Sequence, residues 1–146
     1  MALTGTYSRN LDDKHRLALP KPLCTEFGEE QLTSFYVAPG TQKSLSLYSP
    51  AGFEKLARKI ARRSANRAES LNYVRLFYSR AEKVDLDAQG RIRIPDRLVE
   101  FAGLSRDVVL LGVHDHAEVW DAVAWQKFLT ETGPAFDEMA LQAFAD

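Results

Sequence analysis

One ten-residue motif occurs twice in the chain, and this repeat constrains the fold more than any other feature. The motif reads Leu-Asp-x-x-x-Arg, then Leu or Ile, any residue, Leu or Ile, and Pro, at residues 11–20 and 86–95. A second match follows in the same order, because residues 47–56 align with residues 119–128. Two ordered matches at nearly equal spacing predict that the chain contains two copies of one small unit.

The two units are predicted at residues 5–51 and 81–124, and each is expected to be rich in β-strands. Hydrophobic residues alternate with polar or small ones at Leu17 and Leu19, and the matching Ile92 and Ile94 do the same. This is the period of a half-buried strand. The polar Asp-x-x-x-Arg stretch before each pair predicts a turn between two strands. Further strands are predicted at 35–37, 44–48, 108–111 and 117–120, and a short helix at 95–103.

Helices are predicted between and after the units. Residues 52–80 form a helical linker with a hydrophobic stripe and a basic remainder, broken near Asn66, where Asn66 and Glu69 resemble a capping box. Asp121 is expected to cap a helix that contains Trp125 and that ends at Gly133-Pro134. The remaining tail, within a C-terminal segment of residues 125–146, either packs as a last helix or frays.

Neither unit has enough strands to cover its own hydrophobic face. Two units that pair with each other solve this problem within one chain. The sequence therefore predicts an α+β fold with a pseudo-twofold β-core and peripheral helices.

Charge is divided unevenly along the chain. Residues 1–80 contain thirteen Lys and Arg against seven Asp and Glu, a net charge of +6, whereas residues 81–146 have a net charge of −7. Such a division indicates either that the basic half binds a polyanion or that the two halves attract each other.

Several functional classes find no support in the sequence. Cys24 is the only cysteine, so a disulfide within the chain and a cysteine-rich metal site are excluded, and Cys24 itself is expected in the core. No cofactor motif and no catalytic acid–base or nucleophile arrangement is present, so the chain is not expected to be an enzyme. The N-terminal residues lack a signal-peptide pattern and no membrane-length apolar run occurs, which favours a cytoplasmic protein.

The Asp-x-x-x-Arg turns are the main candidates for a functional site. Asp12 with Arg16, and Asp87 with Arg91, could form ion pairs that fix each turn, and this interpretation is purely structural. Alternatively, a hairpin turn that carries Arg and Lys could enter the DNA major groove, which accepts a two-stranded ribbon. The first turn is the more basic, and its candidate DNA contacts are Arg9, Lys14, His15, Arg16 and Lys21.

Other candidates have mainly structural interpretations. The basic helix from Lys55 to Arg67 is either a phosphate-binding face or a solvated or partner-binding face, and we favour the latter. His114 and His116 would share one face of a strand, but a metal site would need further ligands, so a polar loop is favoured. Trp120 and Trp125 are expected in the core or at a subunit interface.

The repeated motif resembles the signatures of the MraZ family. Residues 10–20 are similar to the first signature of that family, residues 87–91 are similar to the second, and the resemblance covers nearly the whole chain. It implies two AbrB/SpoVT-like units that fold together as a swapped-hairpin barrel. It also implies a transcriptional regulator, associated with the nucleoid, that forms ring-shaped oligomers. Such a protein would bind direct repeats of double-stranded DNA in the promoter of its own division and cell-wall gene cluster.

The resemblance assigns DNA contact to Lys14 and Arg16, and also to Arg91 in the more acidic second unit. Asp12, Asp87 and Gly90 then have motif or structural roles. One position departs from the family pattern, because the first signature commonly has Gly where this chain has His15. Glycine adopts positive φ without steric cost, so His15 predicts either a different first turn or a direct DNA contact. An assembly or adaptor protein that recruits a protein partner is the alternative function.

Overall fold

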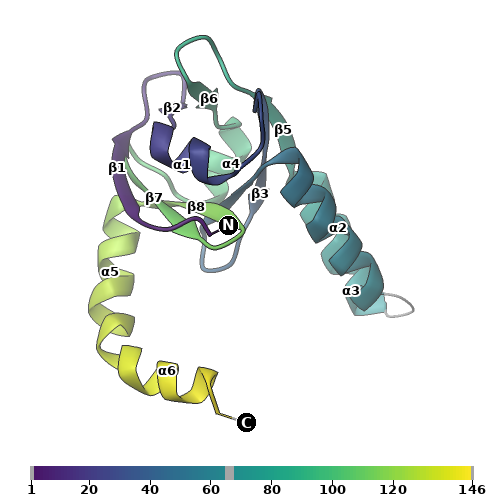
Figure 1. Ribbon diagram of the computed structural model, residues 1–146, viewed down its shortest axis with the longest axis vertical. Coiled ribbons are helices and arrows are strands. Elements are labelled where there is room, and N and C mark those ends of the chain that lie inside the picture. The colour runs from purple at the N-terminus through teal and green to yellow at the C-terminus, as the bar shows by residue number, and fades with distance from the viewer. Residues whose placement is uncertain (1, 65–67, 146) are drawn as a thin grey trace.

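The structure is a computed structural model that describes residues 2–64 and 68–145 (Figure 1). The strands in these ranges are β1 (Thr6–Asn10), β2 (Arg16–Ala18), β3 (Ser34–Pro39), β4 (Leu45–Tyr48), β5 (Glu82–Asp85), β6 (Arg91–Arg93), β7 (Asp107–Val113) and β8 (His116–Asp121). The helices are α1 (Lys21–Glu26), α2 (Pro50–Ser64), α3 (Ala68–Arg80), α4 (Asp96–Phe101), α5 (Ala122–Thr132), the short 3-10 helix η1 (Gly133–Ala135) and α6 (Phe136–Ala143).

The strands form one six-stranded antiparallel sheet and a separate two-stranded ribbon of β2 and β6. The order in the sheet is β1-β7-β8-β4-β3-β5. This order reads the same in reverse when each strand is exchanged for its repeat equivalent: β1 for β5, β3 for β7 and β4 for β8. The first strand of each half pairs with the other half, because β1 pairs with β7 and β5 pairs with β3. The two halves therefore share one sheet and one pseudo-twofold relation.

The α+β class is confirmed, but the barrel implied by the family resemblance is not closed. The edges of the six-stranded sheet are β1 and β5, and in the described chain the ribbon strands pair only with each other. Closing the sheet into a cylinder would require ribbon strands that pair with the edge strands β1 and β5, and no such pairing is present among the described residues. The ribbon covers one face of an open sheet instead.

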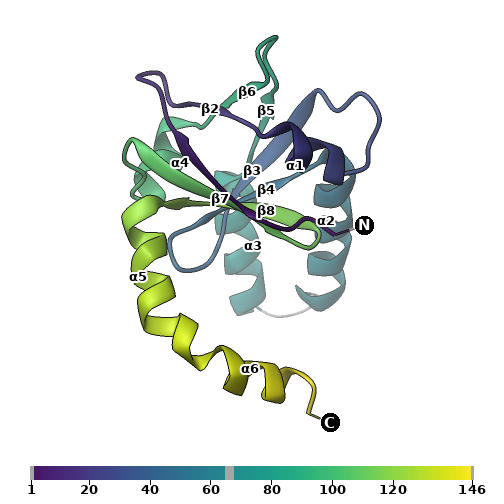
Figure 2. The ribbon, with the colours of Figure 1, turned by 60° about the vertical axis from the view of Figure 1, so that its left-hand side comes forward.

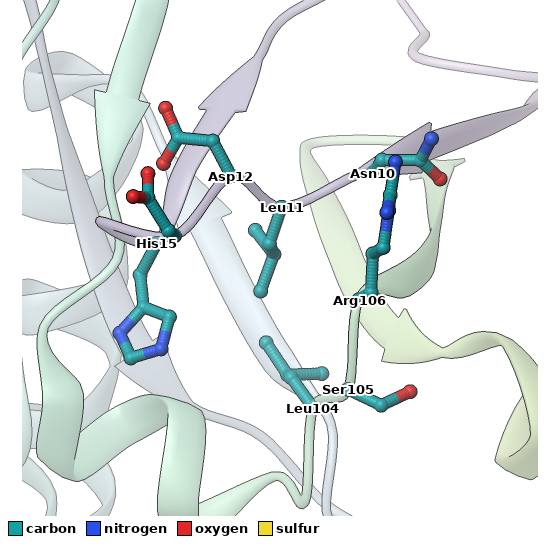
Figure 3. Close-up of a pocket in the computed structure, with 8 residues that line it drawn as sticks. Asn10, Leu11, Asp12, His15, Leu104, Ser105 and Arg106 are labelled. Carbon is teal, nitrogen blue, oxygen red and sulfur yellow. The ribbon is translucent and has the colours of Figure 1, made fainter.

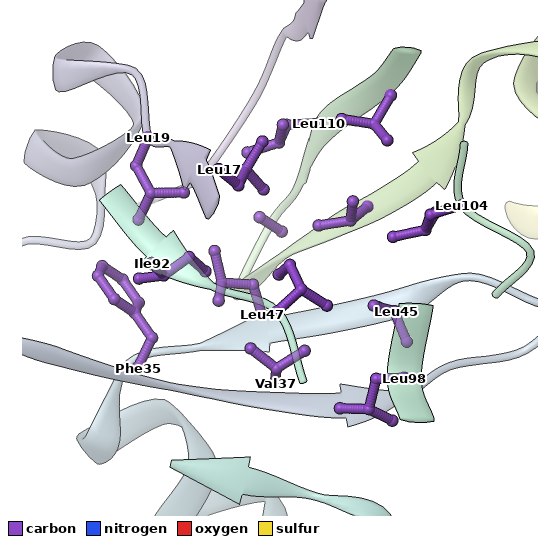
Figure 4. Close-up of a cluster of buried hydrophobic side chains, with 14 of the residues drawn as sticks. Leu17, Leu19, Phe35, Val37, Leu45, Leu47, Ile92, Leu98, Leu104 and Leu110 are labelled. Atoms are coloured by element: carbon purple, nitrogen blue, oxygen red, sulfur yellow. The ribbon is translucent and has the colours of Figure 1, made fainter. Parts of the chain in front are cut away.

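One hydrophobic core fills the space between the sheet and the ribbon (Figure 4). Leu17 from β2 and Ile92 from β6 point inward and are completely buried, as the alternating pattern predicts. Leu23 in α1 and its repeat equivalent Leu98 in α4 are each 1% exposed. Burying a side chain of this size contributes roughly 1.5–3 kcal/mol, so these repeated positions hold the ribbon and both short helices on the sheet.

The longer helices leave the sheet on two different sides (Figures 1 and 2). Helices α2 and α3 form a hairpin in which Phe53 stacks on Tyr36, with ring centroids 4.2 Å apart, and faces Phe77 at 6.2 Å. Helix α5 begins where the Asp121 carboxylate accepts a hydrogen bond from the Val123 N–H, which confirms the predicted cap.

The ends of the remaining helices agree only in part with the sequence expectations. Helix α5 ends at Thr132, immediately before Gly133-Pro134, and the tail then forms α6 rather than fraying. The capping box predicted at Asn66 and Glu69 lies outside the residues and side chains that the structure describes. Across the described ranges, every helix is too short or too polar to cross a membrane.

Candidate nucleic-acid interface

The two repeated turns lie at the same end of the molecule, beyond the ribbon and opposite the C-terminus (Figures 1 and 2). We call residues 11–16 tip 1 and residues 86–91 tip 2. Both tips connect a strand of the six-stranded sheet to a strand of the ribbon. The pseudo-twofold fold therefore places the two copies of the motif close to one surface.

In tip 1, the Asp12 carboxylate organises the whole turn. Its Oδ1 accepts hydrogen bonds from the backbone N–H groups of Lys14, at 2.9 Å, and Arg16, at 2.8 Å. Its Oδ2 accepts from Nε of the Arg16 guanidinium at 2.6 Å. The backbone closes the turn, because His15 N–H donates to the Asp12 carbonyl and Asp12 N–H donates to the Arg16 carbonyl. The predicted ion pair between Asp12 and Arg16 is thus present in tip 1.

Tip 2 repeats this network atom for atom. Oδ1 of Asp87 accepts from the N–H groups of Gln89 and Arg91, both at 2.9 Å, and Oδ2 accepts from Nε of Arg91 at 2.9 Å. Gly90 N–H donates to the Asp87 carbonyl, and Asp87 N–H donates to the Arg91 carbonyl. The same spacing of Asp and Arg therefore gives the same turn in both repeats.

The residue before each arginine has a left-handed backbone conformation. Gly90 has φ of 77° and His15 has φ of 59°. A left-handed conformation costs an ordinary residue roughly 1–2 kcal/mol, and glycine avoids that cost. Tip 1 with His15 nonetheless has the same turn as tip 2 with Gly90, so the expectation of a different first turn is wrong. The Asp12 hydrogen bonds determine the conformation, and Nδ1 of His15 gains a contact with Oδ1 of Asp96 at 2.8 Å.

The two tips are joined to each other at their bases. Ile94 N–H donates to the His15 carbonyl at 2.9 Å, and Leu19 N–H donates to the Gly90 carbonyl at 3.0 Å. These two bonds are related by the repeat and extend the short ribbon into both turns. The positions of the tips relative to each other are thereby fixed by backbone hydrogen bonds, which favours recognition of a ligand of defined spacing.

Three arginines lie on the outer face of the ribbon and its turns. Leu17 and Ile92 point into the core, so their neighbours in each strand point outward. Arg16 lies opposite Arg93, and Ala18 lies opposite Arg91. Arg16 pairs with Asp12 and Arg91 pairs with Asp87 through Nε, and Nη1 of Arg91 also lies 3.9 Å from Oδ2 of Asp12 in the other tip. Among the described residues the terminal nitrogens of Arg16 make no ion pair, so they are available for planar, two-bond contacts to an acceptor such as guanine or phosphate.

The carboxylates that hold these arginines are themselves stabilised as anions. The pKa of Asp12 is lowered to about 2, first by the backbone N–H of Arg16 and then by its guanidinium, with the Lys14 N–H also contributing. The pKa of Asp87 is lowered in the same way by the backbone and side chain of Arg91. Both carboxylates are therefore charged at neutral pH, and both arginine side chains are held in place.

The other three residues predicted to contact DNA, Lys14, Lys21 and Arg9, lie on three different elements around tip 1. Lys14 is exposed in the turn itself, and Lys21 is exposed at the first residue of α1. Arg9 lies on β1, where its guanidinium donates to the Ser8 carbonyl at 2.8 Å and lies 5.9 Å from the centre of the Tyr7 ring. Of these three, only Lys14 belongs to a tip.

Two further basic residues were missed by the sequence reasoning. Arg93 lies on the outer face of the ribbon, and its place as the polar residue between Ile92 and Ile94 was a usable signal. Arg106 lines a cleft of about 630 Å³ beside tip 1, together with Asn10 (Figure 3). No local pattern marks Arg106, because the pairing of β1 with β7 brings it to the tip.

The other candidate residues have structural surroundings. His116 stacks on Tyr48 with ring centroids 5.1 Å apart, and His114 lies in the β7–β8 turn with φ of 66°. Burial opposes the charged form of His116, but hydrogen bonds to Glu118 and Asp115 outweigh it and raise the His116 pKa.

Across residues 2–64 and 68–145, no three His, Cys, Asp or Glu side chains are grouped in a way that could hold a metal ion.

Cys24 and the two tryptophans are packing residues. Cys24 is half-buried against the core, and burial raises the pKa of its thiol, so it lacks the features of an activated nucleophile. Trp120 is buried and packs with Trp125 and Phe128 in a small second cluster at the base of α5.

The fold and the paired tips define a class of protein: tandem β-rich repeats that interleave in one sheet and present two Asp-x-x-x-Arg turns. Comparison with known families agrees, because the family model "MraZ protein, putative antitoxin-like" matches residues 2–74 and 77–144. A Transcriptional regulator MraZ of Kocuria rhizophila is 36% identical over 134 residues, which cover 92% of this chain and 91% of that protein. Its namesake from Moorella thermoacetica is 33% identical over 136 residues, or 93% and 92% of the two chains. The chain belongs to the MraZ family.

Proposed function

We propose that the chain is a sequence-specific DNA-binding transcriptional regulator that acts without catalysis. The observation that carries this proposal is the ribbon with Arg16, Arg91 and Arg93 on its outer face, between two tips whose geometry is fixed. A two-stranded ribbon fits the major groove, where a guanidinium forms paired hydrogen bonds to guanine. The relatives named above are called transcriptional regulators, which supports the same function.

The finer parts of the proposal come from the family resemblance. The regulator would bind direct repeats of double-stranded DNA in the promoter of its own division and cell-wall gene cluster, and would therefore act at the nucleoid. Its two repeat units would be residues 5–51 and 81–124. It would act as a homo-oligomer, most simply a ring, in which several identical tip pairs engage spaced sites. Linked sites raise the effective local concentration, so weak individual contacts suffice.

The proposal is tested by fluorescence anisotropy with labelled DNA from upstream of its own gene and with a scrambled duplex of equal length. Arg16→Ala and Arg91→Ala are compared with Lys127→Ala, a charge removed on α5, away from the tips. Each tip variant is expected to weaken promoter binding roughly tenfold, as loss of a bidentate base contact would. The Lys127→Ala protein should bind like the wild type.

Three results would reject the proposal. The wild type could bind promoter and scrambled DNA equally at moderate salt, the tip variants could bind as tightly as the wild type, or Lys127→Ala could be as damaging as the tip changes. Thermal unfolding of each variant shows whether the fold is kept, since Arg16 and Arg91 also brace their turns. Arg16→Lys separates the two roles, because it keeps the charge and loses the planar fork.

The alternative of an assembly or adaptor protein is favoured by one observation, the exposed hydrophobic residues of α5 and α6. DNA affinity that falls steeply with salt and that prefers the promoter would argue against this alternative.

A further inference from the structure

Arg106 is an exposed arginine beside tip 1, in the cleft of about 630 Å³ that Asn10 also lines. Across the described ranges, no carboxylate lies within ion-pair distance of its guanidinium. Asp12 and Asp13 line the same cleft, but Asp12 is already occupied by the hydrogen bonds of tip 1. An exposed guanidinium without a carboxylate partner is available to an anionic ligand such as a phosphate.

The backbone at Arg106 is held from two sides. The Arg106 carbonyl accepts a hydrogen bond from the Leu11 N–H at 2.8 Å, which connects it to the first residue of tip 1. The preceding residue, Ser105, donates its N–H and its hydroxyl to the Asp121 carboxylate at 2.9 and 2.6 Å. The same carboxylate caps α5. The Arg106 side chain therefore projects from a fixed point of the fold.

Arg106 and Arg16 are linked through two neighbouring residues of tip 1. Leu11 donates to the Arg106 carbonyl, and the next residue, Asp12, bonds to the backbone and side chain of Arg16. On the other side of the tip, the His15 carbonyl accepts from the backbone N–H of the residue after β6. Figure 3 shows Arg106 on one side of Leu11, with Asp12 and His15 on the other. Tip 1 is thus fixed between Arg106 and the ribbon.

The repeat shows that the turn itself does not require this arginine. In tip 2 the equivalent bond runs from the Leu86 N–H to the carbonyl of Thr33, also at 2.8 Å. Thr33 comes directly before β3 as Arg106 comes directly before β7, and Thr33 is exposed as well. The same backbone position therefore carries a cation beside tip 1 and a neutral hydroxyl beside tip 2. The charge of Arg106 is available for a role outside the fold.

We infer that Arg106 binds a phosphate of the DNA backbone beside tip 1 while Arg16 faces the bases. The inference rests on the proposed function and adds a contact to it. A protein element that enters the major groove is bordered by the phosphate backbones of the duplex. Arg106 lies on the flank of tip 1 that faces away from the ribbon, and this is the place of such a border. Phosphate contacts fix the position of the protein on the duplex and contribute affinity on every sequence.

The first test is Arg106→Thr, which gives tip 1 the residue that tip 2 has. Binding of promoter and scrambled DNA is measured by fluorescence anisotropy over a range of salt concentrations. Loss of one phosphate contact should weaken binding of both duplexes several-fold and reduce the salt dependence by about one counterion. The ratio of promoter to scrambled affinity should stay within about twofold of the wild type, whereas Arg16→Ala should lower that ratio.

The matched control moves the charge instead of removing it. Arg106→Thr combined with Thr33→Arg has the net charge of the wild type but no arginine at the flank of tip 1. This double variant is expected to bind DNA as weakly as Arg106→Thr, because a phosphate contact depends on the place of the charge. Thermal unfolding of both proteins checks that the fold is kept.

Methylphosphonate substitutions in the promoter DNA identify the contact directly, because each removes the charge of a single phosphate. At the phosphate that Arg106 binds, the substitution should weaken binding of the wild type several-fold and have no further effect on Arg106→Thr. At the other phosphates, the effects of the DNA change and the protein change should add.

The outcomes distinguish this inference from the proposed function. Equal binding of promoter and scrambled DNA by the wild type would reject the proposed function and the inference with it. For a wild type that prefers the promoter, three results would overturn the Arg106 contact alone. These are an Arg106→Thr protein with the affinity and salt dependence of the wild type, full recovery of binding in the double variant, and methylphosphonate effects that add at every phosphate.

Discussion

In tip 1 the left-handed position is occupied by His15, whereas the equivalent position of tip 2 is Gly90, yet the two turns have the same hydrogen bonds. In both, one Asp carboxylate binds two backbone N–H groups and the Nε of an arginine. The backbone of the tip is therefore determined by the Asp and Arg of the motif. The residue before the arginine sets only how much strain the turn contains.

The surfaces of the two tips differ much more than their backbones. Tip 1 carries Lys14 where tip 2 has Gln89. The carbonyl of Arg106 accepts from the N–H of Leu11 in tip 1, and at the equivalent bond in tip 2 the acceptor residue is Thr33. Tip 1 is therefore the more basic of two turns with equal geometry. The comparison shows that a duplicated scaffold can keep its shape while its charge diverges.

The largest expected difference between the tips is in the free energy of unfolding that each loses when the residue before its arginine is replaced by alanine, because this substitution tests backbone strain. Gly90→Ala puts a side chain at φ of 77°, where the added Cβ would meet no atom within 4 Å, so only the conformational cost applies. We expect a loss of about 1–2 kcal/mol in the free energy of unfolding. His15→Ala should cost less than about 1 kcal/mol, because that position already has a side chain and loses only an exposed contact with Asp96.

Urea unfolding of both variants measures this difference, with Gly90→Asn as a control that tolerates positive φ and should fall between wild type and Gly90→Ala. Equal losses at the two positions would show that the tips do not differ in strain.

A smaller effect is expected from exchanging charge between the tips. Lys14→Gln gives tip 1 the residue of tip 2, and Gln89→Lys does the reverse. If Lys14 contacts a phosphate, its loss should reduce the salt dependence of DNA binding by about one counterion and weaken affinity several-fold on all sequences. Gln89→Lys should increase the salt dependence by a similar amount if tip 2 also reaches the backbone.

Anisotropy titrations over a range of salt concentrations measure the salt dependence of each variant, as the slope of the logarithm of the DNA-binding constant against the logarithm of the salt concentration. A Lys14→Gln slope equal to that of the wild type would remove Lys14 from the interface, and an unchanged Gln89→Lys slope would indicate that only tip 1 approaches DNA.

The smallest expected effect is the pH dependence that the Asp12 carboxylate of tip 1 gives to the free energy of unfolding. The pKa of Asp12 is lowered from 3.8 to about 2, so its stabilisation is complete above about pH 4 and is lost as the pH falls through about 2. Asp12→Asn should therefore differ most from the wild type near neutral pH, and the difference should narrow between about pH 4 and pH 2. Asp13→Asn, a change of the neighbouring exposed carboxylate, is the control. A difference between wild type and Asp12→Asn that stays constant over this range would show that the Asp12 charge does not brace the turn.

Much of the candidate site could be predicted from the sequence, because its geometry is local. The Asp-x-x-x-Arg spacing, the alternation at Leu17 and Ile92, and the cap at Asp121 all depend on residues within a few positions of each other. The left-handed conformation of His15 could not be predicted from the residue type, because histidine adopts positive φ only occasionally. The two hydrogen bonds from the backbone N–H groups of Lys14 and Arg16 to the Asp12 carboxylate fix this conformation. Arg106 was missed because only the pairing of β1 with β7 brings it to the tip.

By itself, the sequence determined that the chain is a duplication, where most of its strands and helices lie, and which turns carry the paired Asp and Arg. These features follow from periodicity and short-range hydrogen bonding. The tertiary structure alone decided that the halves interleave in an open sheet, that Arg93 joins Arg16 and Arg91 on one face, and that α5 and α6 extend away from the sheet. Strand order and register depend on contacts between residues far apart in the chain, and local patterns do not specify which distant strand a given strand will pair with.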